Sequence, residues 1–137
     1  MPELAPLITD VEKIADELGI KEHVKILGFV PQKDLPALYK GAQLFMFPSR
    51  YEGFGMPMLE AMTVGTPVLT AKNSSLEEVG GDAVAYTEHD DEKMCNKMRE
   101  LLQDKEQLQK MSIDGKERAK QFSWQKFVTT ICDTICK

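Results

Sequence analysis

Two glutamates enclose a glycine-containing segment, and this is the part of the sequence best suited to bind a ligand. Glu52 and Glu60 stand eight positions apart, with Gly53 and Gly55 between them. Carboxylates accept pairs of hydrogen bonds from neighbouring hydroxyls, such as those of ribose and sugars. The glycines allow the backbone to bend sharply and to approach a ligand closely.

The position of this segment between two expected elements adds a second binding group. It follows the apolar run Leu44–Phe47 and opens a helix that we expect from about residue 55 to residue 64, ending at Gly65. The first N–H groups of a helix have no partner within the helix and, with the helix dipole, favour an anion such as phosphate. A phosphate cradle between two carboxylates that can bind diols describes a site for a nucleotide sugar.

Spacing alone is weak evidence for this site. Glu92 and Glu100 are also eight residues apart, within an expected surface helix. Each glutamate also has an interpretation without a ligand. In that interpretation Glu52 caps the helix that begins near Gly55, and Glu60 is a solvated helix residue. Phe54 is compatible with a place in the core and with a place in the wall of the site, and the side chains of the methionines at 56, 58 and 62 are interpreted as packing groups.

The elements around this segment alternate between strands and helices up to residue 87. Apolar runs typical of strands buried on both faces are found at 24–29, 44–47, 67–71 and 83–87. Helical patterns are found at 11–18, with Asp10 as the expected N-cap and Gly19 after the end, and at 35–42 after Asp34. A short helix is expected after Ser75, and only helical patterns follow residue 90, the last of them capped by Ser123.

This alternation predicts an α/β fold, a Rossmann-like three-layer domain with a parallel sheet of about four strands and C-terminal helices. Such a domain usually begins with a strand, whereas the first pattern here is a helix. We therefore expect residues 1–137 to form a single domain that is incomplete at its N-terminus.

Composition limits the classes of function. The 137 residues are 42% hydrophobic and 28% charged, as in folded globular proteins, and the net charge of −5 disfavours a nucleic-acid binder. No apolar run approaches the roughly 20 residues of a transmembrane helix, and we expect no signal peptide. Cys95, Cys132 and Cys136 are expected to be reduced thiols in the cytoplasm. Because the two histidines lie far from Cys132 and Cys136, no metal site is expected.

The motif resembles a known enzyme family. The runs 47–55, 59–62 and 65–68 are similar to family 4 of the retaining glycosyltransferases, which have two Rossmann-like domains (the GT-B type), and Glu52 to Glu60 matches their E-x7-E element. The runs 27–31, 34–35, 74–78 and 122–124 are similar as well. The resemblance covers nearly the whole chain, as the C-terminal, donor-binding domain of such an enzyme.

The resemblance implies a role for individual residues. Glu52 is the expected catalytic residue and contacts hydroxyls of the donor sugar, while Glu60 holds the ribose. Gly28 and Val30 are expected beside the base. The backbone of the segment between the glutamates is expected to contact the sugar and the diphosphate, through Gly53, Phe54, Gly55, Met56, Pro57 and Met58. The family transfers a hexose from a nucleotide-diphosphate sugar with retention of configuration, and the resemblance implies no metal or other cofactor.

The resemblance also implies missing parts. In the family, an arginine and a lysine that hold the diphosphate precede the matched region, as does the acceptor-binding domain, so the expected partners are a nucleotide sugar and this N-terminal domain or partner half. Arg50 and Lys72 are basic but receive no role. Alternatives are a non-catalytic nucleotide-sugar-binding module, a subunit of a split enzyme, or a scaffold whose site has decayed. The expected location is cytoplasmic, and the full-length enzyme is compatible with a place at the membrane periphery.

The last helix carries an apolar stripe. Its members are Trp124, Phe127, Val128, Ile131 and Ile135. Large exposed apolar patches favour association. We therefore expect self-association through this helix, or docking of a partner half.

Overall fold

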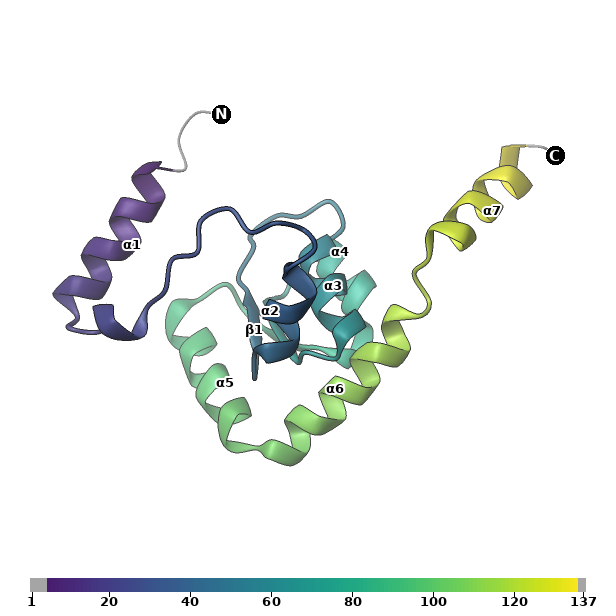
Figure 1. The fold of residues 1–137 in the computed structure, drawn as a ribbon. Coiled ribbons are helices and arrows are strands. Elements are labelled where there is room, and N and C mark those ends of the chain that lie inside the picture. Colours follow the sequence, from purple (N-terminus) through teal and green to yellow (C-terminus); the bar gives the residue numbers. More distant parts are fainter. Residues whose placement is uncertain (1–4, 136–137) are drawn as a thin grey trace. The chain divides into compact units, whose positions relative to one another are not determined.

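The computed structural model describes residues 5–135, and the chain divides into two compact units, residues 1–32 and 33–137 (Figure 1). The first unit contains helix α1 (Ala5–Glu17) and the 3-10 helix η1 (Lys21–His23). The second unit contains α2 (Leu35–Gly41), β1 (Phe45–Phe47), α3 (Met56–Val64), β2 (Val68–Ala71), α4 (Ser74–Gly80), η2 (Gly81–Ala83), β3 (Ala85–Thr87), α5 (Asp91–Gln103), α6 (Lys105–Ala119) and α7 (Trp124–Ile135).

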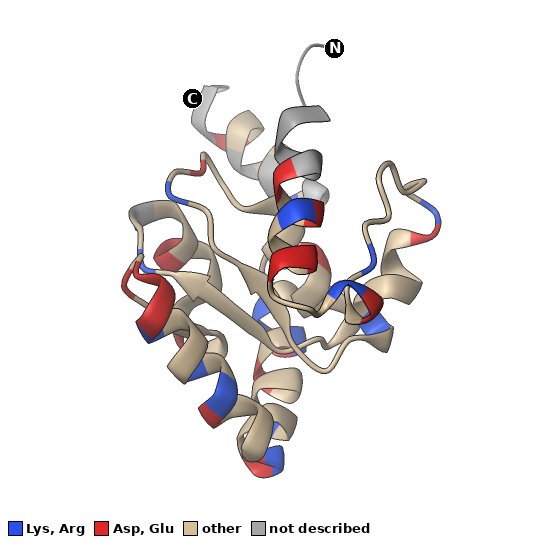
Figure 2. Cartoon of the chain, turned by 90° about the vertical axis from the view of Figure 1, so that its left-hand side faces the viewer, with Lys and Arg blue, Asp and Glu red and all other residues tan. Residues whose placement is uncertain are grey.

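The described residues of the second unit form a three-stranded parallel sheet in the order β1-β2-β3. Phe45 is paired with Val68, and Leu69 is paired with Ala85. All four residues of the central strand β2 are buried. Charged residues lie outside the strands, which are uniformly tan in Figure 2. This composition fits a sheet that is covered on both faces.

Helices cover the two faces of the sheet. Val68 belongs to a core cluster with Met58 and Met62 of α3, whereas the next residue, Leu69, belongs to a second cluster with Met94 of α5 and Met111 of α6. Successive residues of a strand point to opposite faces, so each face of β2 has its own helical layer. The predicted α/β, Rossmann-like class is confirmed.

The strand predicted at 24–29 is wrong. This stretch of the first unit forms no strand, and Ile26, Leu27 and Phe29 are 38%, 58% and 90% exposed. A strand exists only where a neighbouring strand completes its hydrogen-bond ladder. The composition of residues 24–29 suits a strand, but among the described residues no strand pairs with them.

Most predicted helix ends are confirmed, with two corrections. Asp10 is not an N-cap, because α1 already begins at Ala5 and Asp10 lies within it. At the other end Gly19, with a φ of +66°, turns the chain out of the helix as expected. Helix α4 begins one residue before Ser75, because the side chain of Asn73 accepts the N–H of Leu76.

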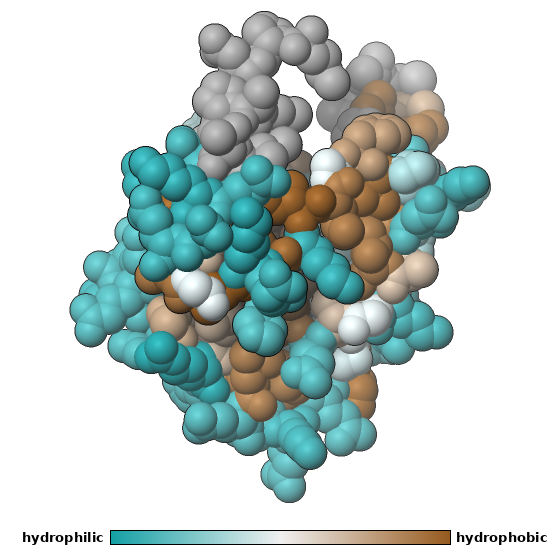
Figure 3. Space-filling view, turned by 60° about the vertical axis from the view of Figure 1, so that its left-hand side comes forward, coloured by the Kyte–Doolittle hydropathy of each residue, from teal (hydrophilic) through white to brown (hydrophobic). Residues whose placement is uncertain are grey.

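The described surface combines hydrophilic side chains with apolar ones that remain exposed between them (Figure 3). In α7, Val128 and Ile131 are 55% and 40% exposed. The other members of the predicted stripe, the side chains at 124, 127 and 135, lie outside the described part of the structure, as does Cys136. Within residues 5–135, no helix has the length and apolar character needed to cross a bilayer.

Candidate functional site

The chain turns from β1 into α3 at Gly55. Its φ of +88° is unfavourable for residues with a side chain, and a Cβ atom there would lie 2.4 Å from Cδ2 of Leu76. A glycine is therefore required both by backbone conformation and by space. A Cβ at Gly53 would meet nothing within 4 Å, so Gly53 lies in an open part of the loop.

Helix α3 presents free N–H groups at its start. Its first intrahelical hydrogen bond runs from the N–H of Leu59 to the carbonyl of Gly55, at 3.2 Å. The N–H groups of Met56 and Met58 precede that bond, and Pro57 has none. Met58 is fully buried, backbone included, whereas Met56 is 45% exposed. The helix start that was expected to bind an anion is present, and anion binding there stays a prediction.

Glu52 is held in place by residues that sequence reasoning did not single out. The hydroxyl of Ser49 lies 3.0 Å from Oε1 of Glu52 and 3.1 Å from the carbonyl oxygen of Tyr51. The hydroxyl of Ser75 donates to the carbonyl of Glu52 at 2.5 Å, and the amide of Asn73 donates to the carbonyl of Ser49 at 3.1 Å. The loop after β1 is thus fastened to the residues after β2, and the carboxylate of Glu52 stays half-buried.

Glu60 is the fifth residue of α3 and lies about 6 Å along the helix axis from Met56. It is half-buried, and the hydroxyl of Tyr39 in α2 donates to its Oε2 at 3.3 Å. Burial, and then the charge of Glu60, raise the pKa of Tyr39. The tyrosine therefore remains a hydrogen-bond donor, and Glu60 is a restrained carboxylate instead of a freely solvated one.

Phe54 is partly packed and partly exposed. Its side chain is 41% exposed, and its ring meets that of Phe122 edge to face, with centroids 5.9 Å apart. The guanidinium of Arg118 lies 5.2 Å from the centroid of Phe122 and also donates to the carbonyls of Glu78 and Val79, at the end of α4. Phe54 is thus packed against another ring and still partly exposed, and its place in the wall of a site stays a prediction.

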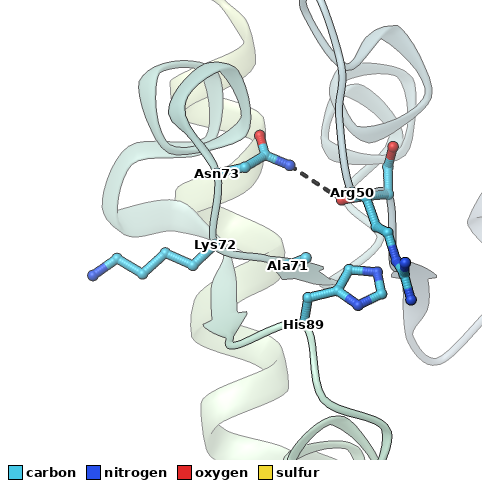
Figure 4. Close-up of a pocket in the computed structure, with 6 residues that line it drawn as sticks. Arg50, Ala71, Lys72, Asn73 and His89 are labelled. Carbon is cyan, nitrogen blue, oxygen red and sulfur yellow. Dashed lines mark hydrogen bonds between the residues drawn. The ribbon is translucent and has the colours of Figure 1, made fainter.

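A pocket of about 380 Å³ lies where the three parallel strands end (Figure 4). Ligands of open α/β sheets usually bind at this edge. Sequence reasoning missed most of its lining, although the positions directly after each strand were the signal that could have found it. The lining residues are Ser49, Arg50, Ala71, Lys72, Asn73 and His89.

The predicted site residues fall into both units. Glu52, Glu60 and the segment between them belong to the second unit, where the turn and helix α3 bring them together. Gly28, with a φ of +61°, and half-buried Val30 belong to the first unit, so their place beside a base stays a prediction. Among the described residues, no three His, Cys, Asp or Glu side chains gather as a metal site.

Comparison with known proteins gives the family. Residues 9–118 match the family that is described as "Glycosyl transferases group 1". The chain is 42% identical over 115 residues to the O-antigen chain mannosyltransferase B of Escherichia coli, covering 82% of this chain and 30% of the relative. It is 34% identical over 130 residues to a D-inositol 3-phosphate glycosyltransferase of Salinispora tropica, covering 91% of this chain and 27% of the relative.

A solved structure has the same fold. Sucrose-phosphate synthase from Thermosynechococcus elongatus superposes with a TM-score of 0.83 at 23% identity, covering 90% of this chain and 32% of that one. The chain spans less than a third of the length of the relatives named here. With most of its residues matched by the family, the chain belongs to the glycosyl transferases group 1, as a domain of the GT-B type.

Proposed function

We propose that this chain is the donor-binding domain of a glycosyltransferase and holds a nucleotide-diphosphate sugar. The observation that carries the proposal is the restrained pair of carboxylates at the start of α3: Glu52 bonded by Ser49, and Glu60 bonded by Tyr39. In this proposal Glu52 contacts the hydroxyls of the sugar and Glu60 those of the ribose. A fixed carboxylate loses little conformational freedom when it binds a diol.

The diphosphate binds at the start of α3, through the N–H group of the exposed Met56. When the bond between the sugar and the diphosphate breaks, negative charge develops on the leaving phosphate oxygen. The positive end of the α3 dipole stabilises that charge without reorganisation, and this lowers the barrier to transfer. The proposed reaction transfers a hexose to an acceptor hydroxyl with retention of configuration, and the domain uses no metal or other cofactor. The mannosyltransferase named among the relatives supports a hexose donor.

Transfer also requires an acceptor site, which we assign to a further domain or partner half. The relatives have about 70% of their length outside the part that resembles this chain, which leaves room for such a domain. Gly28 and Val30 are proposed to lie beside the base of the bound nucleotide.

Calorimetric titration with nucleoside diphosphates and their sugar derivatives tests donor binding. We expect saturable binding of one nucleotide and a loss of roughly 10- to 150-fold in affinity for Glu60→Gln, because a hydrogen bond to a charged group contributes about 1.5–3 kcal/mol. Glu100→Gln, on the exposed side of α5, is the matched control and should leave the affinity unchanged. Equal affinity of the wild-type chain and Glu60→Gln would exclude the proposed role of Glu60.

A further inference from the structure

The pocket at the strand ends contains cationic groups that the proposed donor site does not use. Its lining includes neither Glu52 nor Glu60 and holds no acidic residue. Arg50 and His89 both line the pocket, and in the view of Figure 4 the side chain of Lys72 extends to the opposite side from theirs. The ammonium of Lys72 instead lies 4.0 Å from a carboxylate oxygen of Glu77.

Within the described part of the chain, the guanidinium of Arg50 donates no hydrogen bond to another residue. Among the described side chains, no carboxylate lies within 4.0 Å of its guanidinium. The acids on either side of His89 are directed elsewhere: Glu88 is paired with the ammonium of Lys93, and Asp90 accepts the backbone N–H of Lys93 at 2.8 Å. The pocket is therefore locally cationic in a chain whose net charge is −5.

One ring nitrogen of His89, a residue that lines the pocket, is engaged by a backbone carbonyl. Its Nε2 lies 3.2 Å from the carbonyl oxygen of Pro48, and because a carbonyl only accepts, Nε2 carries a proton. Nδ1 then accepts a hydrogen bond from an O–H group when the ring is neutral, and donates to an oxyanion when the ring is charged. The amide of Asn73 is already engaged with the carbonyl of Ser49, so Arg50 and Nδ1 of His89 are the groups available to a ligand.

We propose that this pocket binds a phosphoryl group, with Arg50 holding two of its oxygens and His89 a third. The guanidinium presents paired N–H donors that match two phosphate oxygens. A phosphoryl group also supplies either an O–H or an oxyanion to Nδ1, whereas an ionised carboxylate offers acceptors alone. The volume of the pocket suits a small molecule or a headgroup that carries the phosphate.

Titration of the isotope-labelled 137-residue chain with inorganic phosphate, followed by NMR, tests this site. The Nε–Hε signal of Arg50 and the ring Cε1–Hε1 signal of His89 should shift saturably at millimolar phosphate, and acetate should bind more weakly. Arg50→Gln should weaken phosphate binding at His89 about tenfold or more. His89→Gln, whose amide can still reach the carbonyl of Pro48, should weaken it several-fold.

Arg99→Gln is the matched control, because Arg99 is an exposed arginine of α5 and its loss changes the net charge equally. Absence of saturable shifts at Arg50 and His89, equal binding of acetate, or an equal loss in Arg99→Gln would overturn the proposal. The backbone amides of Gly55 and Met56 report phosphate at the start of α3 separately. The pocket signals should persist in Glu60→Gln, so failure of the donor site and failure of this pocket are distinguishable.

Two further ligands identify the source of the phosphoryl group. Displacement of inorganic phosphate by a hexose phosphate would support the pocket and assign it to a phosphorylated sugar. Sedimentation with phosphatidylglycerol vesicles that is lost in Arg50→Gln and kept in Arg99→Gln would support it and assign it to a lipid headgroup.

Discussion

At the residue scale, Gly55 fixes the geometry from which the proposed donor site follows. Replacement by alanine forces a side chain into a left-handed conformation, at about 1–2 kcal/mol, and into an overlap with Leu76, at about 1–3 kcal/mol. We expect Gly55→Ala to lower the free energy of unfolding by roughly the sum of these costs, as measured by urea unfolding.

Gly53→Ala is the matched control for that substitution, because nothing lies within 4 Å of the added Cβ. Its free energy of unfolding should remain within about 1 kcal/mol of the wild-type value. If both variants lose the same stability, the cause is not the close packing of Gly55 on Leu76.

Removing the hydroxyl of Ser49 or of Tyr39 tests the roles of Glu52 and Glu60 separately. Ser49→Ala releases Glu52, so we expect it to weaken binding of a nucleotide sugar several-fold and to leave binding of the nucleoside diphosphate unchanged. Tyr39→Phe releases Glu60 and should weaken binding of both ligands. Calorimetry with the two ligands measures the difference, and an equal effect of Ser49→Ala on both would contradict the assignment of Glu52 to the sugar.

The sequence was sufficient to identify Glu52 and Glu60 as candidates and insufficient to show what holds them. Ser49 stands close to Glu52 in the sequence, but Tyr39 contacts Glu60 across 21 positions and Ser75 contacts Glu52 across 23. Such contacts depend on how helices pack against the strands. No local spacing encodes them, and the hydrogen bond of His89 to Pro48 is of the same kind, since it joins the ends of two strands.

At the element scale, Tyr86 of β3 joins the sheet to the end of α4. Its hydroxyl lies 2.9 Å from the carbonyl oxygen of Gly81 and 3.2 Å from that of Leu76. Burial, and then the charge of Glu77, raise the pKa of Tyr86 to about 12. Because this value exceeds that of an unfolded tyrosine, about 10, the stability that Tyr86 contributes is complete below pH 10 and is lost as the pH rises toward 12.

We therefore expect the free energy of unfolding of the wild-type chain to fall across this range, and that of Tyr86→Phe to fall less. Urea unfolding at several pH values from about 9 to 12 measures both slopes. Tyr39 and Lys93, whose pKa values are also raised, add a decline of the same sign to both proteins, so the difference between the slopes reports Tyr86. Identical slopes would show that Tyr86 does not titrate as described.

Elements with a strong local signal were predictable, and those defined by a neighbour were not. Helix α3 follows from Gly55 and Gly65 at its ends, where φ is positive at both. The strand expected at 24–29 failed because pairing, not composition, makes a strand. Likewise Asp10 suits an N-cap locally, yet it lies within α1, which already includes Ala5.

At the scale of the whole molecule, self-association through α7 stays a prediction. Val128 and Ile131 are exposed on this helix, which favours burial against another surface. We expect sedimentation of the wild-type chain at micromolar concentration to show a dimer, and Ile131→Glu to shift it toward the monomer. Glu substitution at Ile113, an exposed apolar residue of α6, is the control. A wild-type chain that sediments only as a compact monomer would refute the prediction.

The family match covers residues 9–118. It includes helix α3 and the loop from Ser49 to Gly55 before it, and both lie wholly within the second unit. The central claim is therefore that the start of α3 binds the diphosphate of a nucleotide sugar. The most direct measurement is an NMR titration of the chain with nucleotide sugars, followed at the backbone amides of Gly55, Met56 and Met58. We predict saturable shifts at these amides that weaken in Glu60→Gln. Saturable shifts confined to other parts of the chain, or none at millimolar ligand, would contradict the account.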